Sequence, residues 1–412
     1  MENRKFVNSF CKIASSFAFL AMTALPHFVF AYEIETHAGL TQEIAKFYNQ
    51  SLPDRALTES DTQLLMDGSR REDDPPRWMN HYYDPILGTG LTAIPGTWLS
   101  SKAWAHDAVA QTFALYNPVK QSTLAFYYAM VDPQPFLASD FTWERAIGDY
   151  VSGDRERALI GLGHILHLIE DVNVPDHTRN DAHAFGSPYE RWAEQFTPAT
   201  INLAPYLYFK QPVVLNALDA YFDGIANYSN RNFYSKDTID RLEYPEPKPD
   251  YVGREGGYFY GYKSDEVGDY HLVVYNNYSS DFDWASQDKK SSLVDKQGDR
   301  VLRDYWERLA PKAVQYGAGV VDLFFREVAK AQARPGDHVL VVPPSLVAQA
   351  FRATQVFLGT AMDWVTSFSG ALEDVTIVLL DAPEAPAAGP VFARAVSNTI
   401  LRPVDPTPVV VP

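Results

Sequence analysis

Apolar residues recur at spacings of three and four through most of the first three hundred positions, which is the pattern of amphipathic helices. Glycine, proline, asparagine and aspartate, the residues that commonly end helices, lie between these segments. Helices are expected at residues 38–50, 100–116, 119–130, 154–171, 188–197, 212–227 and 297–332. Pro311 should bend or break the last of them. Patterns typical of strands are scarce before residue 250, so the predicted fold class is all-α, a multi-helix domain.

Two regions depart from the helical pattern. Residues 228–296 are rich in Tyr, Asn, Asp, Ser and Gly, most clearly at 251–263, and predict a long loop or a small hairpin inserted over the helical body. Such an insertion is either functional or decorative. Residues 336–412 combine an apolar helical stretch, a β-like run at 375–380 and a tail rich in Pro and Ala. This mixed C-terminal segment is short for an independent domain, and its pattern assigns it no role.

The first residues have the pattern of a secretory signal peptide. Basic residues precede an apolar run at 13–25, and Val29 and Ala31 are small residues at the two sites that a signal peptidase reads. The alternative is an uncleaved membrane anchor, but the run is much shorter than the roughly 20 residues that a spanning helix needs. We therefore expect cleavage after Ala31, an exported protein that is periplasmic or secreted, and a helical domain at 32–335.

The composition and the net charge limit which partners and which metal ligands the protein can have. The chain has 412 residues, and its 46% hydrophobic content excludes a wholly disordered protein. The formal net charge of -17 argues against a general polyanion binder, and we expect no double-stranded nucleic acid partner. The one cysteine, Cys11, lies in the predicted signal peptide. A metal ion in the mature protein must therefore be held by nitrogen and oxygen ligands rather than by thiolates.

Histidines and carboxylates gather in one segment. His167 and Asp171 are four residues apart on a predicted helix, so their side chains share a face. His177 follows on a turn, His183 lies in a loop, and Glu190 begins the next helix. Neutral imidazole and carboxylate are the ligands that zinc accepts when thiolates are absent. A lone histidine near a helix end is ordinary, but this spacing of several donors predicts a metal site. His164, three residues before His167, is left unassigned.

Two upstream clusters carry further donors. His81 precedes an aromatic pair and an Asp-Pro turn, and an acidic run that includes Asp67 and Asp73 lies ahead of it. Such an acidic loop usually does no more than face the solvent. Because this one lies near a histidine, we predict that it contributes metal ligands. His37 would be the sixth residue after cleavage. The new amino group and carbonyl of Tyr32 can chelate a metal ion.

These motifs together resemble the zinc-dependent phospholipase C and single-strand-specific nuclease superfamily. The most specific match is the frame His167-x3-Asp171-x5-His177. The stretch from Asn80 to Pro85 is similar to the aromatic-Asp-Pro stretch that follows a ligand histidine in the phospholipases. The histidine five residues after the mature N-terminus has the spacing of the nuclease branch. The matches span residues 32–192, and the resemblance implies an all-helical domain around a tri-zinc cluster.

The resemblance also implies which residues bind the metal ions. The implied zinc ligands form three sets, namely Asp73, His81, His167 and Asp171; the amine and carbonyl of Tyr32 with His37 and a bridging Asp171; and His177, His183 and Glu190.

The chain departs from the family pattern in three places. The first mature residue is Tyr32 where the family usually has Trp, which should be tolerated because the backbone supplies the ligands. Asp73 fits a Gly-x4-Asp frame, whereas Asp67 fits the usual distance to the following histidine; we prefer Asp73. His183 and Glu190 are further apart than the family's usual pair, so that set is the least secure.

The implied reaction is phosphodiester hydrolysis. Zinc lowers the pKa of a bound water towards neutrality and compensates charge on phosphate oxygens. Asp171 and Asp73 are the expected catalytic residues, the first as the bridge and the second to orient or deprotonate the water. Arg179 follows His177 and can contact the phosphate, although an ordinary surface arginine is the expectation that we prefer.

The substrate is predicted less sharply than the reaction. Trp78, Tyr82, Tyr83 and the tyrosines at 258–262 suit either a quaternary ammonium head group or stacked bases. The aromatic-Asp-Pro stretch favours a phospholipase C-like hydrolase over a single-strand nuclease, another phosphoesterase or a non-enzymatic zinc-binding protein. We accordingly expect a phospholipid or other phosphodiester substrate, transient contact with a membrane surface, and a monomer.

Overall fold

The computed structural model describes residues 34–74, 77–92, 98–113, 140–183, 186–275, 291–295 and 299–333. They belong to one compact unit, Met1–Val365. The predicted signal peptide, Tyr32, the helix expected at 119–130 and the segment 336–412 lie outside the described residues. No helix of the described part is long and apolar enough to cross a membrane.

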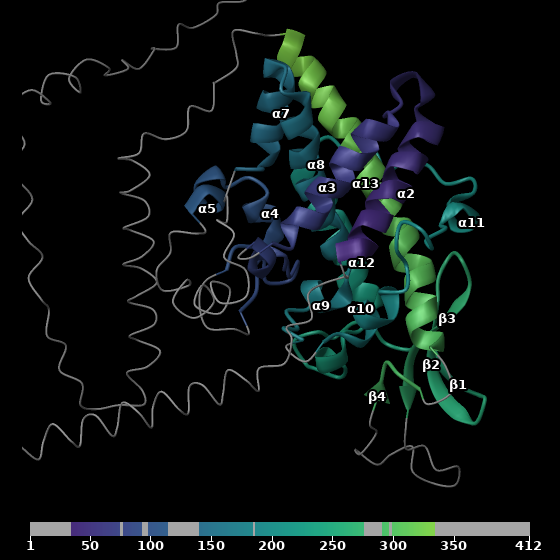
Figure 1. Ribbon diagram of the computed structural model, residues 1–412. Helices are drawn as coiled ribbons and strands as arrows, with labels where there is room; N and C mark the ends of the chain where they lie inside the picture. Colours follow the sequence, from purple (N-terminus) through teal and green to yellow (C-terminus); the bar gives the residue numbers. More distant parts are fainter. Residues whose placement is uncertain are drawn as a thin grey trace, which may run out of the picture. The chain divides into compact units, whose positions relative to one another are not determined.

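Long helices form most of the described structure. They are α2 (Ile34–Ser51), α3 (Glu59–Glu72), α7 (Trp143–Ser152), α8 (Arg155–Asp171), α12 (Leu218–Asn232) and α13 (Arg300–Ala333). Short helices and turns of 3-10 helix connect them, namely η1 (Pro53–Arg55), η2 (Arg77–Asn80), α4 (Ser101–Trp104), α5 (Ala108–Phe113), α9 (Pro175–Thr178), α10 (Pro188–Ala193), α11 (Ala204–Leu207) and η4 (Lys236–Thr238). Figure 1 shows α3 lying against α8, with α2 and α13 beside them.

Several helices begin at side-chain caps that the sequence supplies. Thr58 accepts a hydrogen bond from the backbone of Asp61 at the start of α3, and the Asp61 side chain accepts one in return. Thr142 caps α7, which ends at Gly153 with a φ of 96°. Asp154 then caps α8. These polar residues therefore set where the helices that carry the site begin.

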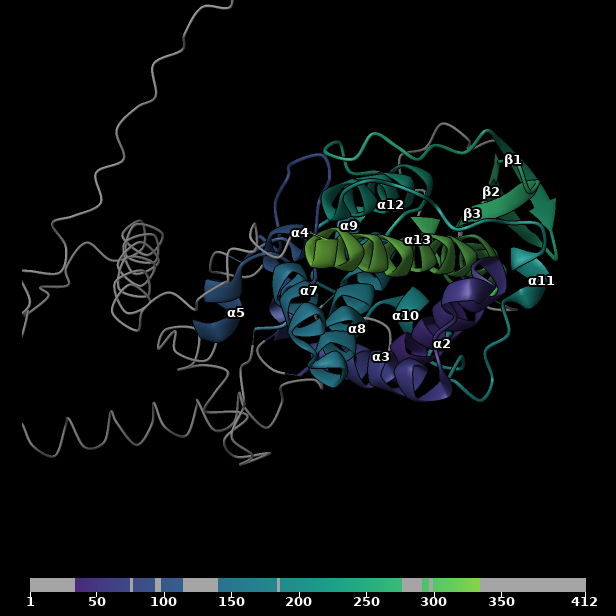
Figure 2. The same cartoon turned by 90° about the horizontal axis from the view of Figure 1, so that it is seen from above.

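Helix α13 connects the helical body to the sheet. It packs against α2, α7, α8 and strand β3 (Asp269–Tyr275), as Figures 1 and 2 show from two directions. Pro311 lies inside this one helix, so the expected break is wrong. Both sides of the proline are buried in the core, and tertiary packing of this kind outweighs the hydrogen bond that a proline removes.

The prediction of an all-α fold is also wrong. Strands β1 (Tyr251–Glu255), β2 (Tyr258–Ser264), β3 and β4 (Ser291–Ser292) form an antiparallel sheet in that order. Gly256 and Gly257 join β1 to β2 with φ angles of 56° and 89°, the left-handed conformation that a two-residue hairpin requires. The sheet exists because β3 buries Leu272 and Val274 in the main core, which an isolated hairpin could not do.

Other differences concern helix boundaries. The helix expected at 154–171 is confirmed as α8. The one expected at 100–116 is divided into α4 and α5, and α12 begins later than expected. Helices α3 and α7 were not predicted. Helix α3 was missed because it approaches α8 through Gly68 rather than through an apolar stripe.

Candidate metal centre

Asp171 lies at the centre of the site. Asp171 is the last residue of α8. It is fully buried and faces four histidines from different parts of the chain. Its Oδ2 atom is 2.7 Å from Nδ1 of His81 and 3.1 Å from Nε2 of His167. Its Oδ1 atom is 3.4 Å from Nε2 of His37 and 3.6 Å from Nδ1 of His177. A carboxylate shared in this way has the arrangement of a bridge between two cations.

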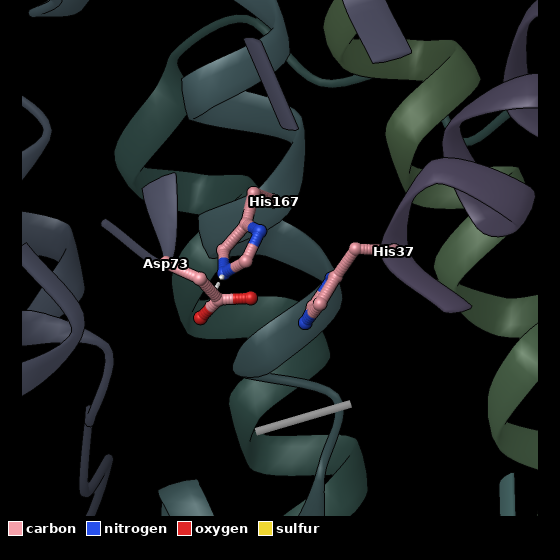
Figure 3. A group of neighbouring side chains, drawn as sticks. All are labelled: His37, Asp73 and His167. Carbon is pink, nitrogen blue, oxygen red and sulfur yellow. Dashed lines mark ion pairs between the residues drawn. The ribbon is translucent and has the colours of Figure 1, made fainter. Parts of the chain in front are cut away.

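Asp73 adds a second carboxylate to this centre. It follows α3 directly, and its Oδ1 atom is 3.5 Å from Nε2 of His167 and 3.7 Å from Nδ1 of His81. Figure 3 shows Asp73, His167 and His37 pointing toward one another, from the end of α3, from α8 and from α2. Asp67 instead pairs with Arg70 and is 47% exposed. The structure therefore brings Asp73, and not Asp67, to the histidines.

The third predicted set also converges. His177 lies in α9 and Glu190 in α10, and their Nε2 and Oε1 atoms are 3.2 Å apart. Nε2 of His183 is 3.2 Å from the other oxygen of Glu190. His183 has a φ of 30°, and this left-handed conformation turns the loop so that a pair widely spaced in sequence meets in space.

The described part of the chain thus contains several buried groups that can hold a metal ion. They are His37, Asp73 and His167; His81, His167 and Asp171; His177, His183 and Glu190; and Asp176, Asp181 and His183. In each group the donor atoms lie within 4.8 Å of one another. The last group was not predicted from the sequence. Tyr32, the remaining predicted ligand, lies outside the described residues.

Many of the donor atoms lack the hydrogen-bond partners that buried polar atoms normally have. Within the described structure, the carboxylate oxygens of Asp73, Asp171 and Glu190 and both ring nitrogens of His177 are buried and accept or donate no hydrogen bond. They approach one another closely, but without hydrogen-bond geometry, because they point toward shared positions between them. Buried polar atoms normally find partners, so this concentration of exceptions fits a bound cation.

Burial sets the charge state of most of these groups. It lowers the pKa of His37 to about 3 and that of His177 to about 4, which keeps both rings neutral and able to bind a metal. It raises the pKa of Asp73 to about 6 and that of Glu190 to about 8. Both carboxyl groups would be stabilised in the charged form by a cation.

Asp171 and His81 have the opposite shifts. Burial disfavours the charged form of each, but the surrounding histidines outweigh burial and hold the pKa of Asp171 well below its usual range. Asp171 in turn raises the pKa of His81 to about 10 despite burial. The buried carboxylate thus requires a positive partner, and a metal cation meets the same requirement.

Outer contacts hold the ligand rings in place. Nδ1 of His167 is 2.8 Å from the carbonyl oxygen of Ser69, and Nδ1 of His183 is 2.8 Å from that of Asp181. Nε2 of His81 is 3.6 Å from Glu72, a buried residue that also binds Arg77. Such contacts fix ring orientation at metal sites. Glu72 had no assigned role in the sequence, although it lies in the acidic run beside Asp73.

The predicted aromatic residues divide between the site and the core. Tyr82 stacks on His177 with ring centroids 4.4 Å apart, and its hydroxyl lies 3.3 Å from Nδ1 of His183. Tyr83 belongs to the main core and donates to Asp223. Trp78 is half-buried beside a small cluster that includes Tyr82. Tyr82 is therefore the aromatic residue in direct contact with the donor groups.

Arg179 is fully buried, so the expectation of a surface arginine is wrong. Its guanidinium donates to the carbonyl oxygens of Asn230 and Glu246 and to the hydroxyl of Thr238. It also lies 4.5 Å from the ring centroid of Tyr244. These contacts give Arg179 a structural role, because they connect the end of α9 to α12 and to the segment that follows α12.

No family model matches the chain, and no curated protein matches it. The chemistry of this protein is accordingly inferred from the site itself.

Proposed function

We propose that this protein is an exported zinc-dependent phosphoesterase that hydrolyses phosphodiester bonds, most similar to a phospholipase C. The observation that carries the proposal is the buried Asp171 carboxylate, which faces four histidines from separate parts of the chain. Histidine and carboxylate donors of this kind, with no thiolate, suit zinc. The resemblance of the motifs supports three zinc ions and places the backbone of Tyr32 among their ligands.

Zinc, when bound, supplies a water of lowered pKa and positive charge for the phosphate oxygens. The role of the protein's own side chains in the reaction is to hold and to transfer protons. Asp73 is one of the buried carboxylates of the centre, with its Oδ1 atom 3.5 Å from Nε2 of His167, and a carboxylate in this position can accept a proton. We propose that the Asp73 carboxylate accepts the proton of the attacking water. Tyr82 forms one wall beside His177 and can pack against a substrate group.

A phospholipid is the substrate that we propose. The support is the aromatic-Asp-Pro stretch after His81 and the predicted export, both of which are sequence features. Aromatic residues also stack on nucleic-acid bases, so single-stranded DNA is the discriminating alternative in any assay. Transient contact with a membrane surface and a monomeric state belong to the same proposal.

The test begins with metal content and continues with activity. The mature protein should contain about three zinc ions and release the phosphorylated head group from phosphatidylcholine. His167→Ala should abolish hydrolysis, whereas His271→Ala on β3 should retain it, because His271 pairs with Asp304 rather than with the site. Fewer than two zinc ions per chain, or full activity of His167→Ala, would contradict the proposal. Hydrolysis of single-stranded DNA alone would identify a nuclease.

A further inference from the structure

Glu170 is a buried glutamate next to the bridging residue Asp171. Its side chain is fully shielded from solvent. One carboxylate oxygen is 2.7 Å from Nδ1 of His37, and the other accepts a hydrogen bond of 2.8 Å from the hydroxyl of Thr41. His37 and Thr41 are four residues apart on α2, so they share the helix face that meets α8. Glu170 therefore connects the two helices beside the metal centre.

The two neighbouring carboxylates contact opposite ends of the same ring. Nδ1 of His37 meets Glu170, while Nε2 faces Asp171 at 3.4 Å. A metal ion on Nε2 leaves the ring proton on Nδ1, where a carboxylate is the strongest acceptor available to it. Contact with Glu170 thus selects the nitrogen that faces the cluster and fixes the rotation of the ring.

This arrangement differs from that of two other ligand rings. His167 and His183 are oriented by backbone carbonyl oxygens, which are neutral. His37 has the carboxyl group of Glu170 instead, which is a side-chain partner of the kind that orients metal-ligating imidazoles. Thr41 holds that carboxylate in turn, so its position does not depend on His37 alone.

We propose that Glu170 is the positioning residue of the metal site that contains His37 and that it sets the affinity of that site. The inference rests on the proposed metal centre and deepens it. Glu170 does not contact the substrate in this assignment; it acts through His37.

Metal affinity provides the test. Metal-free wild-type protein, Glu170→Gln, Glu170→Ala and Glu43→Ala are titrated with zinc against a chromophoric chelator. Glu43 is the matched control, because it is also buried and also connects α2 to a distant segment, through the backbone of Leu203. Glu170→Ala should bind one zinc equivalent about 10- to 100-fold more weakly, and Glu170→Gln, which keeps an acceptor, should lose less. Glu43→Ala should bind like the wild type.

A second measurement covers the case in which Glu170→Ala fails to fold. Nitrogen-15 NMR of the zinc-loaded wild type should place the His37 proton on Nδ1 and the metal on Nε2. The opposite assignment, or wild-type affinity for every equivalent in Glu170→Ala, would overturn the inference. These results are separate from the proposed function, which fails if the wild type binds fewer than two zinc ions per chain.

Discussion

Gly68 of α3 and Gly163 of α8 lie face to face where the two helices cross. A Cβ atom on Gly163 would be 2.9 Å from the Cα atom of Gly68 and 2.2 Å from the carbonyl oxygen of Leu65. The missing side chains let the two backbones approach closely. The residues just beyond the crossing belong to the site, with Ser69 and Asp73 on one side and His167 on the other. Helix packing and site geometry are therefore set by the same pair of glycines.

Adding one methyl group at this crossing should damage both stability and the site. In Gly68→Ala the new Cβ would lie 2.0 Å from the carbonyl oxygen of Ile160, so the helices must separate. We expect a loss of about 3 kcal/mol in the free energy of unfolding, together with weaker metal binding. The control is Gly148→Ala, where no atom lies within 4 Å. That variant should gain roughly 0.5 kcal/mol from its better helix propensity. Equal stabilities would contradict the packing argument.

The two candidate upstream carboxylates can be separated by mutation. Asp73→Asn should reduce kcat by about 100-fold or more, because it removes both a donor and the proposed general base. Asp67→Asn is the matched control, since Asp67 is half-exposed and pairs with Arg70. It should change kcat by less than about twofold, as expected for a surface substitution outside the site. Steady-state kinetics measure both effects. A larger loss of kcat in Asp67→Asn than in Asp73→Asn would assign the upstream carboxylate to Asp67.

Arg179 should affect stability rather than chemistry. Arg179→Met leaves the buried carbonyl oxygen of Asn230 without this donor and removes the hydrogen bonds to Glu246 and Thr238. An unmet buried acceptor costs about 1–3 kcal/mol, so we expect a loss of about 2 kcal/mol by chemical denaturation. The folded fraction should retain its kcat/KM within a few fold. Loss of activity at unchanged stability would instead assign Arg179 to the phosphate.

His106 should make stability depend on pH. Its hydrogen bond to Glu144 is the largest cause of its raised pKa, and Asp219 acts in the same direction against burial. Because the folded pKa lies above the unfolded value of 6.5, the stabilisation is complete below that value. It is lost as the pH rises through the folded pKa. All three side chains are partly exposed, so the stabilisation should not exceed about 1 kcal/mol.

The measurement compares the wild type with His106→Gln. Unfolding free energies at about pH 5.5 and about pH 9 should differ between the two proteins more in acid than in base. A difference that grows with pH would have the wrong sign for this ion pair.

Contacts within one helix were the most predictable part of the site. His167 and Asp171 share a face of α8 because residues four apart in a helix always do. The hairpin at Gly256 and Gly257 was foreseen as one of two alternatives, but its growth into a sheet was not. That growth depends on β3 finding the core beside α13, which is a distant part of the chain.

The sequence determined which side chains can bind a metal, since residue type and helical spacing are properties of neighbouring positions. It did not determine which of these side chains lie together in space. Asp73 joins the centre and Asp67 does not, because the close α3–α8 crossing at Gly68 turns one inward and leaves the other half-exposed. Glu170 and Arg179 acquired their partners in the same way, from segments far away in sequence. Such contacts depend on how whole elements pack, and short-range periodicity carries no information about that packing.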